Sequence, residues 1–279
     1  MSTYIFIDGG YLRRAHAQTV EKWFGFEAPL HLPFAIHKFA QLSNRPDSLE
    51  VQVIYSNGGE TQAFYYDCLD EERKEAETEQ GFNCRLREQE ERLRALRDLN
   101  NCHIRLGTLK GPKRRRQKEV DVLMAVDMMA HAARNNMGKA VLVAGDLDFR
   151  PAVEALVQMG IVVHIIAGKY VAKELTWAAS SFNELSFRDF YNFTDLTEKR
   201  LRPLPSVQDY IPSRDQTTLT RKGILKGDTC NLYELDGRYA LHFPNFTIDG
   251  SYRERVFVHN NLEEIELLLE IEYERVQWI

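Results

Sequence analysis

The chain has 279 residues, of which 44% are hydrophobic and 28% are charged, and its formal net charge is −5. This is an ordinary globular composition with enough apolar material for a core. The negative net charge argues against a general nucleic-acid coat protein, which would be basic, so any nucleic-acid binding requires a local basic patch.

The cysteines and the N-terminal residues restrict the class of protein further. Cys68, Cys84, Cys102 and Cys230 show no C-x-x-C spacing, so neither a zinc knuckle nor a dithiol redox motif is supported. Cysteines without framework spacing in a chain of this length fit reduced thiols in the cytoplasm. The sequence has no signal-peptide pattern and no apolar run long enough to span a membrane. We therefore expect a cytoplasmic protein without membrane segments.

The N-terminal part begins with an apolar run, Tyr4–Ile7, which is closed by Asp8-Gly9-Gly10 and predicts a buried strand that ends in a turn. Apolar residues at helical spacing, or i,i+4 charge pairs, predict helices farther on. Short apolar runs predict two more strands. The predicted helices cover residues 11–20, 33–42 and 60–100, and the predicted strands cover residues 49–55 and 103–106.

The next part alternates helices with buried strands. A loop is expected over residues 107–117, helices over 118–135, 149–159 and 171–182, and strands over 139–144 and 161–167. Such alternation favours a parallel sheet covered by helices on both faces. The fold class is therefore α/β, a three-layer sandwich over residues 1–194.

After Thr194 the composition changes, and three prolines between residues 202 and 216 predict a linker over residues 195–216. Residues 217–279 are predicted to form a small β-rich accessory domain, in which Asp236-Gly237 is a hairpin signal. Its strands are expected at residues 223–226, 230–235, 239–243 and 255–258. Residues 262–276 predict an acidic amphipathic helix, which is a poor surface for nucleic acid and favours a protein contact, self-association or intramolecular packing.

Four aspartates are expected to converge at one edge of the sheet. Asp8 and Asp146 each follow a predicted strand, Asp148 starts the next helix, and Asp121 lies near the start of the helix from Lys118. Sites in open parallel sheets form outside the carboxyl ends of the strands, close to the N-termini of the following helices. Carboxylates are the ligands that Mg²⁺ and Mn²⁺ prefer, and such ions assist phosphodiester hydrolysis. The sequence thus predicts a metal centre at Asp8, Asp121, Asp146 and Asp148.

Each acidic residue also has a structural interpretation. Asp8 fits a group that accepts hydrogen bonds from turn amides, and Asp148 fits the N-cap of the following helix. Asp121 and Asp127 lie on an almost wholly apolar helix, where a carboxylate needs a partner or a metal. Asp127, about 120° around that helix from Asp121, is expected to support the ligands by hydrogen bonding. Lys118 is expected either to contact a phosphate or to offset part of the negative charge of the carboxylates. Its structural alternative is an ordinary lysine in the first turn of a helix.

A basic cluster precedes the helix that carries Asp121. Residues 105–118 contain seven Lys or Arg and no acidic residue, in contrast to the acidic average of the chain. Clusters of this kind hold phosphate backbones, although a charged loop is more often only solvated. We expect RNA contacts from Lys110, Lys113, Arg114, Arg115, Arg116 and Lys118. Phe64, Tyr65 and Tyr66 are expected in the core rather than as base-stacking groups.

Three segments in this order resemble the NYN domain in its LabA-like branch, a relative of the PIN nucleases. They are Ile7–Leu12, Lys118–Val122 and Leu142–Phe149, and the resemblance covers roughly residues 3–190. It implies a PIN-like, Rossmann-like sandwich and Mg²⁺- or Mn²⁺-dependent cleavage of RNA. The four aspartates match the acidic positions of the family, and Asp127 matches a further one. The chain departs at Leu147, where Ser is common, and it lacks an Asn near Gly10 that many members carry.

The predicted function is a metal-dependent ribonuclease, most simply an endoribonuclease, which hydrolyses RNA phosphodiester bonds. The alternative is a non-catalytic RNA- or protein-binding regulator that retains the NYN fold. Other phosphate chemistries fit less well. The first strand has no D-x-D for a phosphatase of the haloacid dehalogenase type, no adjacent acids for a receiver domain, and no G-x-G-x-x-G for a dinucleotide fold.

Overall fold

The computed structural model describes residues 2–43, 61–69, 73, 76–107, 113–209, 218–235, 237–250 and 252–279, with the backbone alone at 113–118 and 235. It divides into two compact units. Unit 1 comprises Met1–Gln18 and Leu30–Phe193, and unit 2 comprises Thr19–Pro29 and Thr194–Ile279. Helix α1 (Gly9–Phe24) therefore begins in unit 1 and ends in unit 2.

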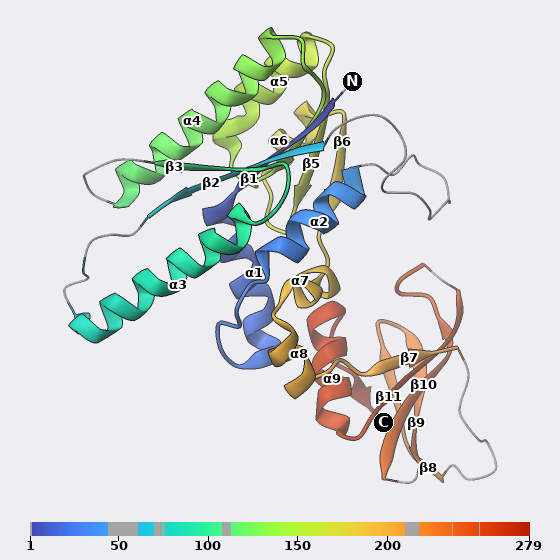
Figure 1. Ribbon diagram of the computed structural model, residues 1–279. Coiled ribbons are helices and arrows are strands. Elements are labelled where there is room, and N and C mark those ends of the chain that lie inside the picture. Colours follow the sequence, from blue (N-terminus) through green and yellow to red (C-terminus); the bar gives the residue numbers. More distant parts are fainter. Residues whose placement is uncertain are drawn as a thin grey trace. The chain divides into compact units, whose positions relative to one another are not determined.

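Unit 1 contains a six-stranded sheet in the order β3-β2-β1-β4-β5-β6, and each neighbouring pair is parallel (Figure 1). The first strand is buried from Tyr4 to Asp8, as expected for a strand covered on both faces. The chain winds outward in both directions from β1 and β4, so a topological switch point lies between these two strands. The strands are β1 (Ser2–Asp8), β2 (Thr61–Cys68), β3 (Cys102–Gly107), β4 (Met137–Val143), β5 (Val162–Ala167) and β6 (Ser181–Glu184).

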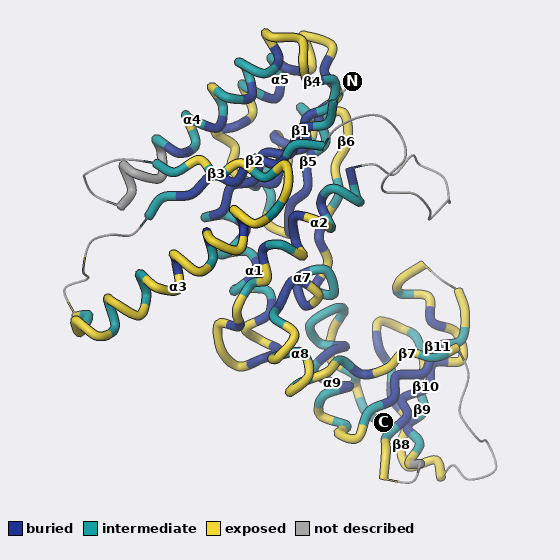
Figure 2. Tube along the Cα trace, viewed as in Figure 1, coloured by how far each residue is buried: buried dark blue, intermediate teal, exposed yellow. Residues whose placement is uncertain are grey.

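Helices cover both faces of this sheet. One face packs against α4, α5 and α6 through a core that includes Phe6, Met124, Met128 and Leu142. Figure 2 shows the buried strands between helices whose outer sides are exposed. The first layer contains α4 (Lys113–Ala133), a 3₁₀ turn η1 (Leu147–Phe149), α5 (Arg150–Gln158) and α6 (Lys173–Ala178), and the second contains α1, α2 (Leu32–Ser43), α3 (Glu79–Arg97) and α7 (Phe187–Phe193). The predicted α/β three-layer sandwich is confirmed.

Three predicted elements of unit 1 differ from the structure. Residues 61–68, predicted within a long helix, form strand β2, because the run Ala63–Tyr66 is apolar and aromatic and is buried in the sheet. The helix begins at Glu79, where the Thr78 side chain accepts a hydrogen bond from the Gly81 amide at 3.1 Å. The predicted strand over residues 49–55 lies outside the described residues.

The other two differences concern helix ends. Helix α4 begins at Lys113, so residues 113–117 are helical rather than part of a loop; Lys, Arg and Gln are good helix formers and the sequence has Gly-Pro just before them. The helix predicted over residues 171–182 is restricted to α6, because Ser181–Glu184 pair with β5 as an edge strand.

Unit 2 contains a six-stranded sheet in the order β12-β8-β9-β10-β11-β7, with antiparallel neighbours. The rings of Phe243, Phe246 and Phe257 meet edge to face in its core. The elements are α8 (Leu196–Leu201), β7 (Ser206–Gln208), β8 (Thr218–Leu225), β9 (Asp228–Leu235), β10 (Arg238–Phe246), β11 (Arg253–His259), α9 (Leu262–Glu272) and β12 (Gln277–Trp278). The predicted strands and acidic helix are therefore present.

Part of the predicted linker has regular structure. Helix α8 and strand β7 both lie within residues 195–216, and β7 pairs with β11 at Val207↔Phe257. A strand of three residues at a sheet edge tolerates nearby prolines because few of its amides are needed for pairing. Among the helices that the structure describes, none combines the length and apolarity that crossing a membrane requires.

Candidate active site

Asp8 is the last residue of β1 and lies at the topological switch point. Its side chain is only 5% exposed, and Oδ1 accepts a hydrogen bond from the Tyr11 amide at 2.8 Å, so Asp8 caps the start of α1. Burial raises the pKa of Asp8, and the charge of Asp67 adds to this, while the Tyr11 hydrogen bond and the charges of Arg14 and Arg13 oppose it. The capping interpretation and the ligand interpretation of Asp8 are compatible.

The glycines around Asp8 and Asp146 allow aromatic rings to pack against the backbone. A Cβ atom at Gly145 would lie 2.6 Å from Cε2 of Tyr11, and a Cβ atom at Gly9 would overlap the Tyr65 ring. The Tyr11 hydroxyl accepts a hydrogen bond from the Gly168 amide at 2.8 Å. Tyr11 thereby connects the carboxyl ends of β1, β4 and β5, which explains why a glycine and a tyrosine are needed at these positions.

Asp121 lies on α4, and its pKa responds to the charges of the other three aspartates. Its pKa is raised to about 7, first by burial and then by the charges of Asp8, Asp146 and Asp148. The charges of the other three predicted carboxyl groups thus act on Asp121. The charge of Arg14 opposes this repulsion at Asp121, as it does at Asp8.

Asp146 and Asp148 lie just beyond β4 on the exposed turn η1. Oδ1 of Asp146 accepts a hydrogen bond from the Asp148 amide at 3.1 Å, so Asp146 is the N-cap of η1. The N-cap interpretation of Asp148 is wrong, because Asp148 lies inside this turn and α5 begins after Phe149 without a side-chain cap. Both carboxylates are left exposed at the same edge as Asp8.

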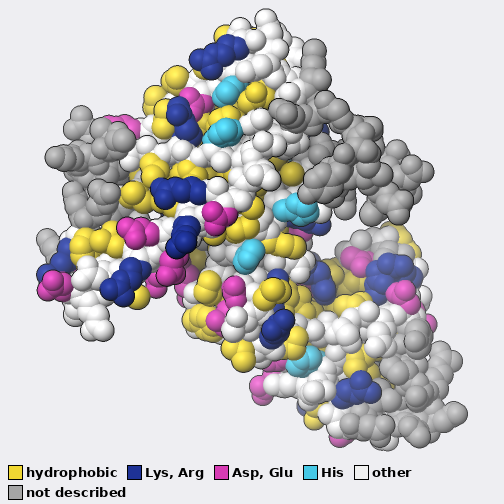
Figure 3. Space-filling view, in the orientation of Figure 1, with side chains coloured by type: hydrophobic (Ala, Val, Ile, Leu, Met, Phe, Trp, Pro, Cys, Tyr) yellow, Lys and Arg dark blue, Asp and Glu magenta, His cyan; other side chains and the backbone are white. Residues whose placement is uncertain are grey.

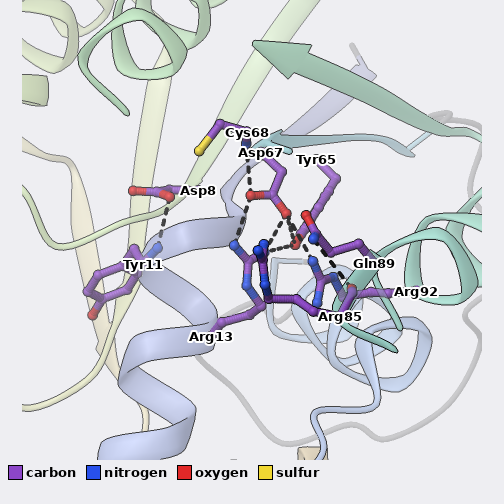
Figure 4. A network of polar contacts seen from close by, with 9 residues as sticks. All are labelled: Asp8, Tyr11, Arg13, Tyr65, Asp67, Cys68, Arg85, Gln89 and Arg92. Atoms are coloured by element: carbon purple, nitrogen blue, oxygen red, sulfur yellow. Dashed lines mark hydrogen bonds and ion pairs between the residues drawn. The ribbon is translucent and has the colours of Figure 1, made fainter. Parts of the chain in front are cut away.

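A fifth carboxylate at this edge, Asp67 at the end of β2, was not predicted. Arg13 on α1 donates to both of its oxygens, with Nη2 2.8 Å from Oδ1 (Figure 4). The Tyr65 hydroxyl donates to Oδ2 at 3.1 Å, the Cys68 amide donates to Oδ1 at 2.8 Å, and Arg92 lies 3.8 Å away. Asp67 follows a buried apolar run as Asp8 does, so the same strand-end signal identifies it once β2 is recognised.

The pairing of Asp67 distinguishes it from the four clustered aspartates. Its side chain is 1% exposed and is held by a bidentate arginine, a structural arrangement. Within the described residues, Asp8, Asp121, Asp146 and Asp148 form no ion pair. These four carboxylates therefore lack the pairing that holds Asp67.

Asp127, predicted to support the cluster, has different partners in the structure. Arg105 on β3 donates to both of its oxygens, at 2.9 and 3.0 Å, and the Tyr66 hydroxyl donates at 2.9 Å. Its charge is not among the main influences on the pKa of Asp121. The described partners of Asp127 are therefore Arg105 and Tyr66, because the 120° turn of α4 directs it toward the β3 edge, and its support of the acidic cluster stays a prediction.

The basic residues predicted to contact RNA are only partly described. Lys110 lies outside the described residues. The other five belong to the first two turns of α4, with their backbone alone described: Lys113, Arg114, Arg115, Arg116 and Lys118. They precede Asp121 on the same helix.

The donor set suits a hard divalent cation, but its geometry does not yet form a coordination shell. All four side chains offer carboxylate oxygens, and the pKa of Asp121 is raised by burial and by repulsion, the second of which a cation would relieve. In the described residues, however, no three His, Cys, Asp or Glu side chains are grouped closely enough to hold a metal ion.

Comparison with known proteins identifies the family. The NYN domain model matches residues 2–186. The chain belongs to the NYN domain family. NYN domains are generally nucleases of the PIN-like superfamily, act on RNA and typically use divalent metals. The match ends near the boundary of unit 1 with the C-terminal part of unit 2.

Two further comparisons add little to the family assignment. No curated protein matched the chain. A crystal structure of a protein of unknown function from Vibrio parahaemolyticus RIMD 2210633 is similar at a TM-score of 0.38 and 15% identity, over 70% of this chain and 96% of that chain. A similarity of this size supports no conclusion about function.

Proposed function

We propose that this NYN protein is a metal-dependent ribonuclease whose centre is formed by Asp8, Asp121, Asp146 and Asp148. The observation that carries the proposal is the raised pKa of Asp121, for which burial is the largest cause and the charges of Asp8, Asp146 and Asp148 are the next. A partly buried carboxylate that is repelled by three others is costly for the fold, and binding a cation offsets that cost. Membership of a family of RNA-acting nucleases supports the same conclusion.

In this proposal the four aspartates would hold Mg²⁺ or Mn²⁺, which neutralises phosphate charge and lowers the pKa of a bound water. The residues of the chain prepare the site. The Tyr11 amide fixes the orientation of Asp8, and the Asp148 amide fixes that of Asp146. Because the pKa of Asp121 is about 7, this carboxyl group retains a proton part of the time at neutral pH until a cation displaces it.

Phosphate binding is assigned to basic residues on two helices. Arg14 is exposed on α1, and its charge acts on both Asp8 and Asp121. The basic turns of α4 precede Asp121 on the same helix. The charge of Arg14, together with the basic sequence that precedes Asp121, supports a phosphate backbone that crosses the acidic cluster.

The alternative is a non-catalytic RNA- or protein-binding regulator. One observation favours it, namely that no three candidate ligands in the described part are grouped for metal binding. Carboxylates at exposed turns such as η1 can rearrange when a cation binds, whereas a regulator would not need them to do so. The two functions therefore differ in whether metal binding alters these side chains.

The test is cleavage of mixed RNA and of single-stranded DNA by the purified chain in Mn²⁺, Mg²⁺ or EDTA. Asp146→Asn is the test variant, and Asp98→Asn, an exposed aspartate at the end of α3, is the matched control. We expect metal-dependent RNA cleavage that is reduced at least about a hundredfold in Asp146→Asn and unchanged in Asp98→Asn. RNA binding without cleavage by either protein would favour the regulator instead.

Cellular location and partners form part of the proposal. All four cysteines are free, which supports the cytoplasmic location. In unit 2, Glu264 pairs with Arg202 and Glu270 pairs with Lys22, so the acidic helix α9 is used partly for intramolecular packing. A protein partner or self-association through the C-terminal region stays a prediction.

A further inference from the structure

A second concave site lies in unit 1, along the edge strand β3 and the face of α4. Its volume is about 600 Å³, within the range of sites that hold small ligands. It is distinct from the acidic cluster, since none of the four aspartates lines it. The lining comes from β2, β3, α4 and the end of α3 and comprises Phe64, Arg97, Cys102, His103, Ile104, Arg105, Asp127, Ala130, His131 and Arg134.

The side chains that line this cavity carry more positive than negative charge. Three arginines line it against a single carboxylate, Asp127, which a bidentate pair with Arg105 already neutralises. Arg97 and Arg134 are exposed and form no ion pair with any described residue. Figure 3 faces this side of unit 1, where His and Lys or Arg side chains lie close together.

Two histidines give the cavity flat walls and hydrogen-bonding groups. The His103 ring stacks on Phe64 with centroids 4.7 Å apart, and it is exposed, so one ring face is covered and the ring can receive a second planar group. Nε2 of His103 lies 2.6 Å from the side-chain oxygen of Gln62. His131 lies 5.0 Å from Phe64, and its Nδ1 atom is buried without a hydrogen-bond partner in the described residues.

We propose that this cavity binds a nucleotide, with its phosphate group on Arg97 and Arg134 and its base against His103. Guanidinium groups recognise phosphate through paired N–H donors, and planar bases stack on exposed rings of aromatic and histidine side chains. The Arg105–Asp127 pair holds the floor of the cavity between β3 and α4, so the site is partly preformed. The phosphate belongs either to a free nucleotide or to a nucleic-acid strand.

The experiment is isothermal titration of the full chain in EDTA with adenosine monophosphate, adenosine, inorganic phosphate and a short single-stranded RNA. EDTA removes metal bridging at the acidic cluster, so failure of the proposed nuclease function would not affect the result. The test variant is Arg97→Gln/Arg134→Gln. The matched control is Arg94→Gln, which alters an exposed arginine of α3 outside the cavity. Circular dichroism would establish that all variants are folded.

We expect adenosine monophosphate to bind more tightly than adenosine, and the double variant to weaken it at least about tenfold, because charged hydrogen bonds are lost. Arg94→Gln should remain within about twofold of the unaltered chain. Weakening for the RNA alone would support the phosphate site and assign its source to a nucleic-acid strand. The proposal would be overturned if the double variant bound both adenosine monophosphate and the RNA as tightly as the unaltered chain does, or if no probe bound.

Discussion

At the scale of single residues, Asp121 shows that a carboxylate placed for function can lower the stability of the fold. Folding raises its pKa from 3.8 to about 7, so the folded chain binds a proton on Asp121 more readily than the unfolded chain does. The stability that this group contributes is therefore present below about pH 4 and is lost as the pH rises through 7. Above pH 7 the ionised carboxylate opposes folding.

We therefore expect Asp121→Asn to stabilise the metal-free protein at pH 8 by about 1–3 kcal/mol, and by less at pH 5. The measurement is urea unfolding in EDTA, followed by far-ultraviolet circular dichroism. Asp98→Asn, far from any carboxylate cluster in the sequence, should leave the free energy of unfolding nearly unchanged. A loss of stability in Asp121→Asn at pH 8 would contradict the repulsion inferred at this site.

His16 on α1 provides a second, opposite pH dependence. It is 1% exposed, and burial lowers its pKa to about 4, while a hydrogen bond with the backbone of Phe190 acts the other way. A histidine with a lowered pKa stabilises the fold fully above the unfolded value of about 6.5, and this stability is lost as the pH falls toward 4. Acid should therefore weaken the packing between α1 and α7.

From pH 7 to pH 5, we expect His16 to account for a loss of about 2 kcal/mol in the free energy of unfolding. The His16→Gln variant should lose less over the same interval, as judged by urea unfolding at both pH values. His37→Gln is the control, since His37 is exposed on α2 and bonds only to Gln41 on the same helix. An equal pH dependence in the His16 variant and the unaltered chain would refute the assignment.

At the scale of elements, the Arg13–Asp67 pair joins α1 to the end of β2. Asp67 is almost fully buried, so loss of Arg13 would leave a buried charge with only Tyr65, the Cys68 amide and the more distant Arg92. We expect Arg13→Met to cost about 3–5 kcal/mol. Arg13→Met/Asp67→Leu should recover much of this, because replacing both partners removes the unpaired charge.

A double-mutant cycle in urea measures this coupling directly. The surface pair Arg150–Glu154 on α5 is the matched comparison, and its cycle should give less than about 1 kcal/mol because both side chains are exposed. If the two cycles give equal coupling energies, burial of Asp67 does not strengthen the pair, and the interpretation of this network would be wrong.

The elements also show what sequence patterns can and cannot predict. β1, β4 and β5 are predictable because each is a short apolar run closed by glycine, and that same signal places Asp8 and Asp146 at one edge. The sequence does not predict β2, because the Glu- and Arg-rich residues downstream extend a helical pattern across it. The position of Asp67 at the end of a strand is therefore not predicted either. The pairing of Asp127 with Arg105 joins two elements 22 residues apart, and no local pattern encodes it.

At the scale of the whole molecule, Trp23 shows how unit 2 depends on the N-terminal part of the chain. It is fully buried on the last turns of α1, its Nε1 donates to the Arg202 carbonyl at 3.2 Å, and the Arg202 guanidinium lies 5.0 Å from its ring. All of these residues belong to unit 2. A fragment that ends at Phe193 would therefore keep Trp23 without the Arg202 carbonyl and guanidinium.

We expect Trp23→Ala to destabilise unit 2 by about 3–5 kcal/mol, because it removes a large buried side chain. Hydrogen exchange resolves the effect by segment, with faster exchange in α9 and β10 and little change in β1 and β4. Trp177→Ala is the control, because Trp177 is exposed on α6 of unit 1. Equal acceleration in both units would show that they unfold together.

The division of α1 between the two units also has a consequence for biosynthesis. Residues 19–29 leave the ribosome before the rest of unit 2, which begins at Thr194. At about 5–20 residues per second, roughly ten seconds or more separate the two. During that interval the turn that carries Trp23 lacks its contacts with Arg202, so we expect nascent chains of intermediate length to expose an apolar surface that chaperones can bind.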